Sequence, residues 1–227
     1  MVYTKPLTRT RETVAIVREL IREGRVSFKG ETIRIANFDL WYIPRHRDIP
    51  LYLSAVFQKG IVLCGEVADG VILTRSTLRT ATQVRMHLAE GARNAGRGAV
   101  QIEVTSLLPT SVGETRDAAL AVLRPGIAFY CGFFPRYNRM MVAHGFATEA
   151  AAITAAWARG DRETAERAVS DAMIDATSVS GTPGQCRARI EAYRQSGIDV
   201  PIISPFARGP DASACFASAI RACAPSA

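Results

Sequence analysis

Several features that would assign a function class directly are missing from this chain of 227 residues. No apolar run reaches the roughly 18 residues that a membrane-spanning helix needs. The first residues lead into polar and charged sequence, which is not the pattern of a signal peptide. We therefore expect a cytoplasmic protein with no membrane partner.

Cysteine and histidine are too scattered to predict a disulfide framework or a metal site. The cysteines are odd in number, lie far apart and form no C-x-x-C pair. We interpret all five as buried, reduced thiols, at positions Cys64, Cys131, Cys186, Cys215 and Cys223. His46, His87 and His144 lack metal-ligand spacing, so we predict no bound metal. Two interpretations fit His144: it is a histidine that faces a pocket, or a histidine of a loop.

The chain also lacks the marks of a serine hydrolase and of a nucleic-acid-binding protein. No G-x-S-x-G nucleophile elbow occurs in it. Its net charge is +7, but the arginines alternate with acidic residues and form no basic stripe with interleaved aromatic residues. We therefore expect no nucleic-acid partner. A mild positive field still suits an anionic cofactor or a small-molecule substrate.

What the chain does contain is an apolar strand, a short helix and a second apolar strand in close succession. The two strands are predicted over residues 50–56 and 71–74. Near-continuous apolar strands joined by a helix are typical of a parallel sheet covered on both faces. Further strands of this sheet are predicted over residues 100–105 and 200–204, and a small hairpin outside it over residues 26–35.

Helical patterns separate these strands. The first helix is predicted over residues 8–23, with Glu12 in its first turn and Gly24 as its stop. An amphipathic helix follows over residues 78–95. The glycines near its end precede a strand, so they indicate a helix stop and a turn, not a phosphate-binding loop; they are Gly91, Gly96 and Gly98. Asp69, before a glycine, is interpreted as a structural turn residue.

An alanine-rich region over residues 114–178 predicts a long helical excursion. Breaks in it are expected at Pro125-Gly126, Pro135 and Gly160-Asp161. Beyond it, residues 182–185 read Thr-Pro-Gly-Gln, which predicts a capping box at the start of a helix. A closing helix is predicted over residues 211–223.

The alternation of strands and helices predicts an α/β fold. A closed (β/α)8 barrel takes eight strands, whereas four are predicted here. Since one strand-helix-strand unit uses about 30 residues, about 100 residues of such a barrel are expected to be missing. We predict a partial TIM barrel, the C-terminal two-thirds, forming a single domain over residues 1–227.

In such barrels the reacting face lies at the C-terminal ends of the strands. These ends are predicted at residues 55–57, 74–76, 106–110 and 205–206. The turn after the first of them opens a helix, whose free amides can hold an anionic or polar edge of a cofactor.

The chain resembles the luciferase-like monooxygenase superfamily from about residue 6 to residue 206. The likeness is greatest to the branch of deazaflavin (coenzyme F420)-dependent oxidoreductases that includes methylenetetrahydromethanopterin reductase. Two runs in this order and spacing carry most of the specificity: Gly65-Glu66-Val67-Ala68-Asp69-Gly70-Val71 and Gly181-Thr182-Pro183 with Cys186. Weaker matches lie at residues 11–20, 26–30, 49–52, 91–97 and 170–171.

This resemblance implies a β/α barrel that holds a flavin or deazaflavin at its mouth. It places the cofactor against Val56, Phe57, Lys59 and Gly60, and a substrate against Thr74. Many relatives have Gly-Pro where this chain has Phe57-Gln58, and phenylalanine fills the space that glycine leaves for a ligand. No catalytic residue is assigned, because the family's first strands, which carry the proton-transfer residues, are expected to be absent.

The resemblance implies an oxidoreductase that transfers a hydride between a deazaflavin, coenzyme F420, and a small organic substrate. One alternative is an FMN-dependent monooxygenase. Another is a non-catalytic truncated remnant, an interaction module that pairs through an exposed sheet edge. We expect a homo-oligomer, and weak or no cofactor binding by these residues alone.

Overall fold

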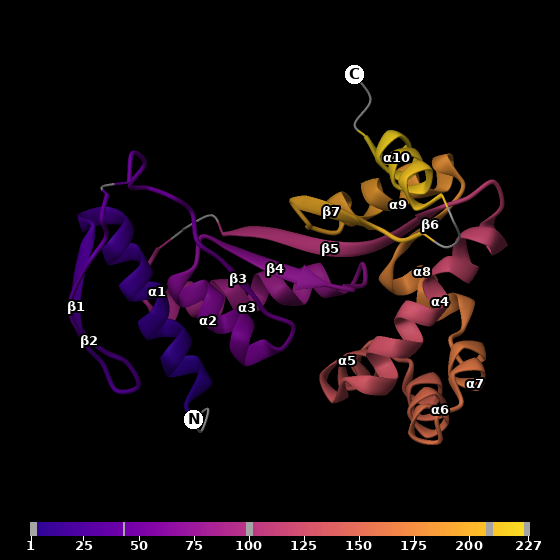
Figure 1. The fold of residues 1–227 in the computed structure, drawn as a ribbon, viewed down its shortest axis with the longest axis horizontal. Coiled ribbons are helices and arrows are strands. Elements are labelled where there is room, and N and C mark those ends of the chain that lie inside the picture. Colours follow the sequence, from indigo (N-terminus) through magenta and orange to yellow (C-terminus); the bar gives the residue numbers. More distant parts are fainter. Residues whose placement is uncertain (1–3, 43, 99–101, 208–210, 225–227) are drawn as a thin grey trace. The chain divides into compact units, whose positions relative to one another are not determined.

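A computed structural model describes residues 4–42, 44–98, 102–207 and 211–224 (Figure 1). Contacts within the chain divide it into two compact units. Unit 1 comprises Met1–Ile72 and Gln83–Val104, and unit 2 comprises Leu73–Thr82 and Thr105–Ala227. The single domain expected over residues 1–227 stays a prediction.

Unit 1 begins with a helix and an antiparallel hairpin, both of which were predicted. Helix α1 (Pro6–Glu23) starts on a proline, whose fixed φ suits the first helical turn, and ends where Gly24 takes a φ of 74°. Strand β1 (Arg25–Lys29) pairs antiparallel with β2 (Arg34–Asp39) and forms a sheet of two strands. The hairpin packs against α1.

Glu12 was expected in the first turn of α1. This was wrong, because the helix begins earlier, at Pro6. The residue is 9% exposed, and its carboxylate accepts hydrogen bonds from the backbone amides of Glu31 (2.5 Å), Thr32 (3.0 Å) and Ile33 (2.9 Å). It also accepts the Thr32 hydroxyl proton, the main reason why the pKa of Glu12 is lowered. The side chain therefore holds the hairpin turn rather than capping the helix.

The predicted strand-helix-strand motif is present. It consists of β3 (Tyr52–Ser54), α2 (Gln58–Val67) and β4 (Gly70–Thr74), and β3 pairs parallel with β4. Strand β4 is mostly buried, as predicted. The strand expected over residues 50–56 is shorter and only half-buried, because β3 lies at one end of the strand order and β4 is its partner there.

Helices α2 and α3 (Thr80–Asn94) approach each other closely through two glycines. A Cβ atom built on Gly91 would lie 1.9 Å from the Val62 carbonyl oxygen, and one on Gly65 would lie 2.2 Å from that of Leu88. Gly91 is thus a packing residue inside α3, not part of a helix stop. Gly96 and Gly98 form the predicted turn, both with positive φ.

In unit 2, β5 (Glu103–Val112) pairs parallel with β6 (Val179–Gly181) and with β7 (Val200–Pro205). The strand order is β3-β4-β5-β6, with β7 also paired with β5, which confirms an α/β fold with parallel strands. Strand β5 runs seven residues beyond the predicted end at residue 105, and residues 100–101 lie outside the described residues. Residues 106–110 are therefore inside a strand, not after it.

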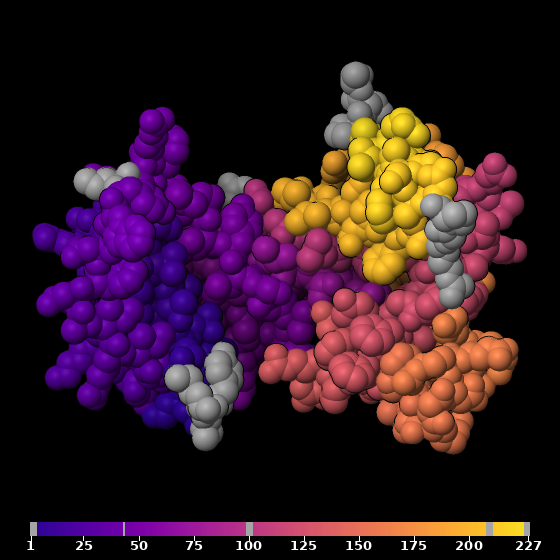
Figure 2. All heavy atoms as spheres, viewed as in Figure 1, coloured from indigo at the N-terminus to yellow at the C-terminus, as the bar shows by residue number. Residues whose placement is uncertain are grey.

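The helical excursion is confirmed. Its five helices are α4 (Arg116–Phe133), α5 (Pro135–Ala143), α6 (Ala147–Ala158), α7 (Arg162–Arg167) and α8 (Asp171–Thr177). The breaks predicted at Pro135 and Gly160 are present, and α5 to α7 pack as one body, coral and orange in Figure 2.

The break predicted at Pro125-Gly126 was wrong, because α4 continues through it. Proline removes one helical hydrogen bond. Packing compensates for that loss, since Leu123, Ile127 and Ala128 around it are all buried.

Helix α9 (Pro183–Gln195) starts with the predicted capping box of Thr182 and Gln185. The Gln185 side-chain oxygen accepts the Thr182 amide proton at 2.9 Å. Helix α10 (Ala212–Cys223) packs beside α9 (Figure 1).

All five cysteines are free, as predicted, but only three are buried, because Cys215 and Cys223 on α10 are half-buried. Burial raises the pKa of the Cys64 and Cys186 thiols to about 12 and that of Cys131 to about 11, so these three thiols stay protonated and unreactive at neutral pH.

Among the described helices, none is by itself both long and apolar enough to cross a membrane. Helices α4 and α5 reach that length and hydropathy only together, across a bend of 109°.

Candidate functional site

The four residues predicted to contact a cofactor lie at the junction of β3 and α2 in unit 1. Val56 and Phe57 precede the helix, and Lys59 and Gly60 lie in its first turn. Phe57 is the N-cap residue of α2, with extended backbone and no capping side chain. Its carbonyl oxygen accepts the amide protons of Gly60 (3.0 Å) and Ile61 (3.1 Å). The amides of Gln58 and Lys59 come before these in the helix, where the helix itself offers no acceptor. The turn can therefore present two amide protons to an anionic or polar group.

The side chains of this turn differ in how they restrict a ligand. A Cβ atom on Gly60 would lie 3.2 Å from the Ala55 methyl carbon, so the turn has little room for a larger residue there. Val56 is half-buried, and Lys59 is exposed. Phe57 is 36% exposed and covers the position where a glycine would leave a ligand direct access to the backbone. Contact of these residues with a cofactor stays a prediction.

Thr74, the predicted substrate contact, is the last residue of β4 and is half-buried. It belongs to unit 2, together with the residues that follow it. The hydroxyls of Ser76 and Ser106 lie 2.6 Å apart, both buried, and the Tyr193 hydroxyl donates to the Ser76 carbonyl at 2.8 Å. These contacts hold the end of β4 rigidly in place. Whether Thr74 contacts a substrate stays a prediction.

Arg75 follows Thr74 directly and is the most unusual residue of unit 2. It has a φ of 49°, in the left-handed region that side chains other than glycine rarely adopt. It is 3% exposed, and its guanidinium carbon lies 4.7 Å from the centre of the Tyr130 ring. Within the described residues its guanidinium has no hydrogen bond and no ion pair, and its Nη1 atom is buried.

The contact with Tyr130 does not balance the burial of this charge. A cation–π contact stabilises by about 2 kcal/mol when it is desolvated. Burying one ion costs several kcal/mol after relaxation. Burial accordingly lowers the pKa of Arg75, against the opposing influence of Tyr130, Tyr137 and Cys131.

The Nε2 atom of His144 is a second buried polar atom without a partner among the described residues. His144 is the C-cap residue of α5 and is half-buried. Burial lowers the pKa of His144, a hydrogen bond to the Arg75 backbone raises it, and the nearby Arg79 lowers it. The structure places His144 in the turn after α5, as the loop interpretation predicts, with its side chain half-buried beside Arg75.

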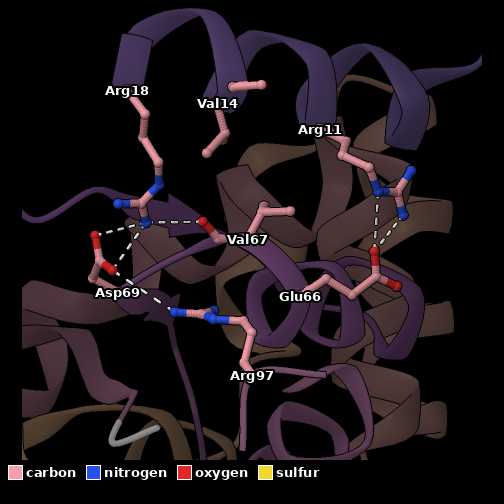
Figure 3. A pocket seen from close by; sticks show the side chains of 8 residues that line it. Arg11, Val14, Arg18, Glu66, Val67, Asp69 and Arg97 are labelled. Atoms are coloured by element: carbon pink, nitrogen blue, oxygen red, sulfur yellow. Dashed lines mark hydrogen bonds and ion pairs between the residues drawn. The ribbon is translucent and has the colours of Figure 1, made fainter. Parts of the chain in front are cut away.

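The charges of unit 1 are arranged quite differently. A pocket of about 430 Å³ has Arg18, Asp69 and Arg97 in its wall (Figure 3). The Asp69 carboxylate accepts hydrogen bonds from Arg18 at 2.9 Å and from the Leu51 amide at 2.8 Å, and Arg97 lies 3.8 Å away.

Arg97 is also satisfied, because its Nη1 atom donates to the carbonyls of Gly65 (2.8 Å) and Ala68 (2.7 Å). Arg11 pairs with Glu66 at the other end of the pocket. The position before β4 and the complete pairing support the structural role predicted for Asp69. The described residues contain no group of three or more potential metal ligands.

Arg75 was not singled out from the sequence, although it lies in one of the predicted strand ends. The signal available there was its place after an apolar strand, which is where parallel sheets carry binding residues. Nothing in the sequence shows that it lacks an acidic partner, because that depends on the side chains that α4 and α5 bring to it.

The model of one family, luciferase-like monooxygenase, matches residues 3–200. Two 5,10-methylenetetrahydromethanopterin reductases are similar to the chain. That of Methanolobus tindarius is 29% identical over 86% of this chain and 60% of its own. That of Archaeoglobus fulgidus is 28% identical over 92% of this chain and 63% of its own length. A putative coenzyme F420-dependent oxidoreductase of Mycobacterium tuberculosis is 24% identical over 89% of this chain and 64% of its own length.

Solved structures agree with these relatives. The coenzyme F420-dependent tetrahydromethanopterin reductase of Methanopyrus kandleri superimposes with a TM-score of 0.81 at 25% identity, over 95% of this chain and 61% of that one. An F420-dependent secondary alcohol dehydrogenase has a TM-score of 0.70 at 22% identity, which shows the fold alone. The likenesses confirm the predicted fold class, part of a TIM barrel. The chain spans less than two thirds of the length of these relatives.

Proposed function

This chain belongs to the luciferase-like monooxygenase family, and from that premise we propose that it is the part of a coenzyme F420-dependent oxidoreductase that positions the deazaflavin and shapes the substrate pocket. The observation that carries the proposal is its similarity to methylenetetrahydromethanopterin reductases over 86% and 92% of its residues. When bound, the deazaflavin supplies hydride transfer to or from a small organic substrate.

The residues of the turn after β3 fit such a cofactor. The amides of Gln58 and Lys59 would hold a polar edge of it, because the first turn of a helix binds such groups with free N–H donors and its positive dipole end. Phe57 would form an apolar wall, and Gly60 would keep the turn tight against Ala55. Thr74, in unit 2, would donate or accept one hydrogen bond with the substrate.

A binding experiment with two cofactors tests the proposal. The purified chain is titrated separately with oxidised coenzyme F420 and with FMN, and the change in cofactor fluorescence is followed. We expect these residues alone to bind weakly, with coenzyme F420 bound more tightly than FMN. Tighter binding of FMN would instead favour the alternative of an FMN-dependent monooxygenase. Binding of neither, with a defined oligomer by light scattering, would favour the non-catalytic interaction module.

Phe57 offers a sharper test of the turn itself. Replacing it with glycine (Phe57→Gly) opens the backbone to the ligand, so we expect severalfold tighter binding of coenzyme F420, about 1 kcal/mol. The control is Phe57→Leu, which keeps an apolar side chain and should bind like the original chain. Equal affinities of all three proteins would show that the cofactor does not contact this turn.

Other expectations stay predictions. The oligomeric state is tested by light scattering, which a homo-oligomer would show as a multiple of 24.6 kDa. A cytoplasmic location, and the absence of nucleic-acid and membrane partners, rest on the sequence alone.

A further inference from the structure

The buried charge of Arg75 requires a partner that the described residues do not supply. Its guanidinium makes no hydrogen bond or ion pair with them, although five N–H groups are available for such bonds. The acidic groups of unit 2 that pair with arginine do so elsewhere, as Asp171 does with Arg116 and Arg124.

Three features around Arg75 are those of a binding position. Its backbone has a φ of 49°, a strained conformation that clusters at ligand sites. It follows β4 at the C-terminal end of a parallel strand, the end where ligands bind in α/β folds. Lastly, His144 brings a second buried nitrogen without a described partner against the same backbone.

The groups around the guanidinium define what it would take. Tyr130 lies beneath it, and Tyr137 packs on Tyr130 at 4.9 Å between ring centres. Both rings are half-buried. A planar guanidinium suits the two oxygens of a carboxylate or phosphate, and the rings suit an apolar or aromatic body.

We propose that Arg75 binds the oxyanion, carboxylate or phosphate, of a small organic ligand whose apolar body packs on the rings of Tyr130 and Tyr137. The site belongs to unit 2 alone and is independent of the deazaflavin, so it stands or falls separately from the proposed function. In an F420-dependent enzyme it would select anionic substrates.

Calorimetric titration with simple probes tests the site. The probes are benzoate and phenyl phosphate, with benzyl alcohol as the neutral analogue. We expect the chain to bind at least one of the two anions and not the alcohol. Which anion binds more tightly tells a carboxylate ligand from a phosphate ligand. Failure of both anions to bind at millimolar concentration would overturn the proposal, whether or not coenzyme F420 binds.

Variants assign the binding to Arg75. Arg75→Met should lower the affinity for the anion at least tenfold. Arg75→Lys should lower it severalfold, because an ammonium group cannot form the bidentate contact. The matched control is Arg162→Met, since Arg162 also stacks on an aromatic ring, that of Trp157 at 3.4 Å, but is exposed. It should leave binding unchanged. Equal losses in Arg75→Met and Arg162→Met would show a nonspecific charge effect and overturn the assignment.

Thermal unfolding separates a binding residue from a structural one. Without ligand, Arg75→Met removes a buried charge that lacks a partner, so we expect its melting temperature to rise by a few degrees. A fall would mean that Arg75 serves the packing of α4, and that outcome would contradict the proposal. Circular dichroism confirms that the variant is folded.

Discussion

Arg18 and Arg97 of unit 1 and Arg75 of unit 2 differ in whether their charges are matched. In unit 1, Arg18 and Arg97 are matched to a carboxylate and to backbone carbonyls (Figure 3). In unit 2, Arg75 is buried against a tyrosine ring without such a match among the described residues. Completed pairs stabilise a fold, whereas a buried ion without its counter-ion costs stability and is retained for another reason. This difference favours a structural role for Arg18 and Arg97 and the proposed binding role for Arg75.

The largest effect is expected where unit 1 is packed most tightly. In Gly91→Ala the new methyl group would lie 1.9 Å from the Val62 carbonyl oxygen, so α2 and α3 must separate. We expect a loss of about 3 kcal/mol in the free energy of unfolding, measured in urea. The control is Gly184→Ala in α9, where a Cβ atom meets nothing within 4 Å. It should be neutral or slightly stabilising, and equal losses would contradict this account of the packing.

The next largest effect concerns the carboxylate that the unit 1 arginines share. Asp69→Asn removes its charge and leaves Arg18 and Arg97 without their acid, at a cost of about 2 kcal/mol. Because the Asp69 side chain is 31% exposed, water moderates this loss. The control is Arg11→Ala, which breaks a single ion pair with Glu66 that no second arginine joins, and it should cost less than about 1 kcal/mol. If both variants lost the same amount, the Asp69 cluster would be an ordinary surface pair.

Removing an arginine from each unit should change the free energy of unfolding in opposite directions. We expect Arg18→Met to lower the free energy of unfolding by about 1 kcal/mol, because Asp69 then loses a hydrogen-bonded partner. We expect Arg75→Met to raise it by a similar amount, about 1 kcal/mol. Urea unfolding of the two variants without added anions measures both changes. Losses in both variants would mean that the two arginines have the same, structural role.

The smallest effect is a dependence on pH. Burial alone would raise the pKa of Asp69, but the Arg18 hydrogen bond, the Leu51 amide and the charges of Arg18 and Arg97 together lower it. The folded carboxyl group thus has a lower pKa than the unfolded one. Its stabilisation is present above the unfolded value, about 3.9, and is lost as the pH falls through the folded value. The difference between the original chain and Asp69→Asn should therefore shrink below about pH 4.

Urea unfolding at a series of pH values measures that difference. Gly184→Ala, compared in the same way, should show no change with pH, because it alters no charged group. A difference for Asp69→Asn that stays constant from neutral to acid conditions would show that the carboxyl group contributes by its shape and not by its charge.

Much of the fold was predictable because its signals are local. The apolar runs at residues 71–74 and 200–204 are strands, and the capping box at Thr182 starts a helix, since each needs only neighbouring residues. β6 was missed because three residues carry too little pattern. The break at Pro125 was predicted wrongly because buried neighbours on α4 outweigh the preference of proline to end helices.

The candidate site divides in the same way. The turn of Phe57 and Gly60 could be located from the sequence, because a strand followed by a helix positions it by chain connectivity alone. The role of Glu12 could not, because its carboxylate is bound by amides about twenty residues away in the chain. Nor could the isolation of Arg75, which depends on the rings that α4 and α5 place around it.

By itself the sequence determined the order of strands and helices, the family and the turn expected to hold a cofactor, since these follow from local patterns and from motifs read in order. Only the tertiary structure decided which charges are matched. Asp69 comes directly before the short strand β4 and Arg75 directly after it. The sequence does not show that the charge of Asp69 is paired and that of Arg75 is not paired within the described residues. That difference arises because an ion's free energy depends on what surrounds it in space and on how far water is excluded.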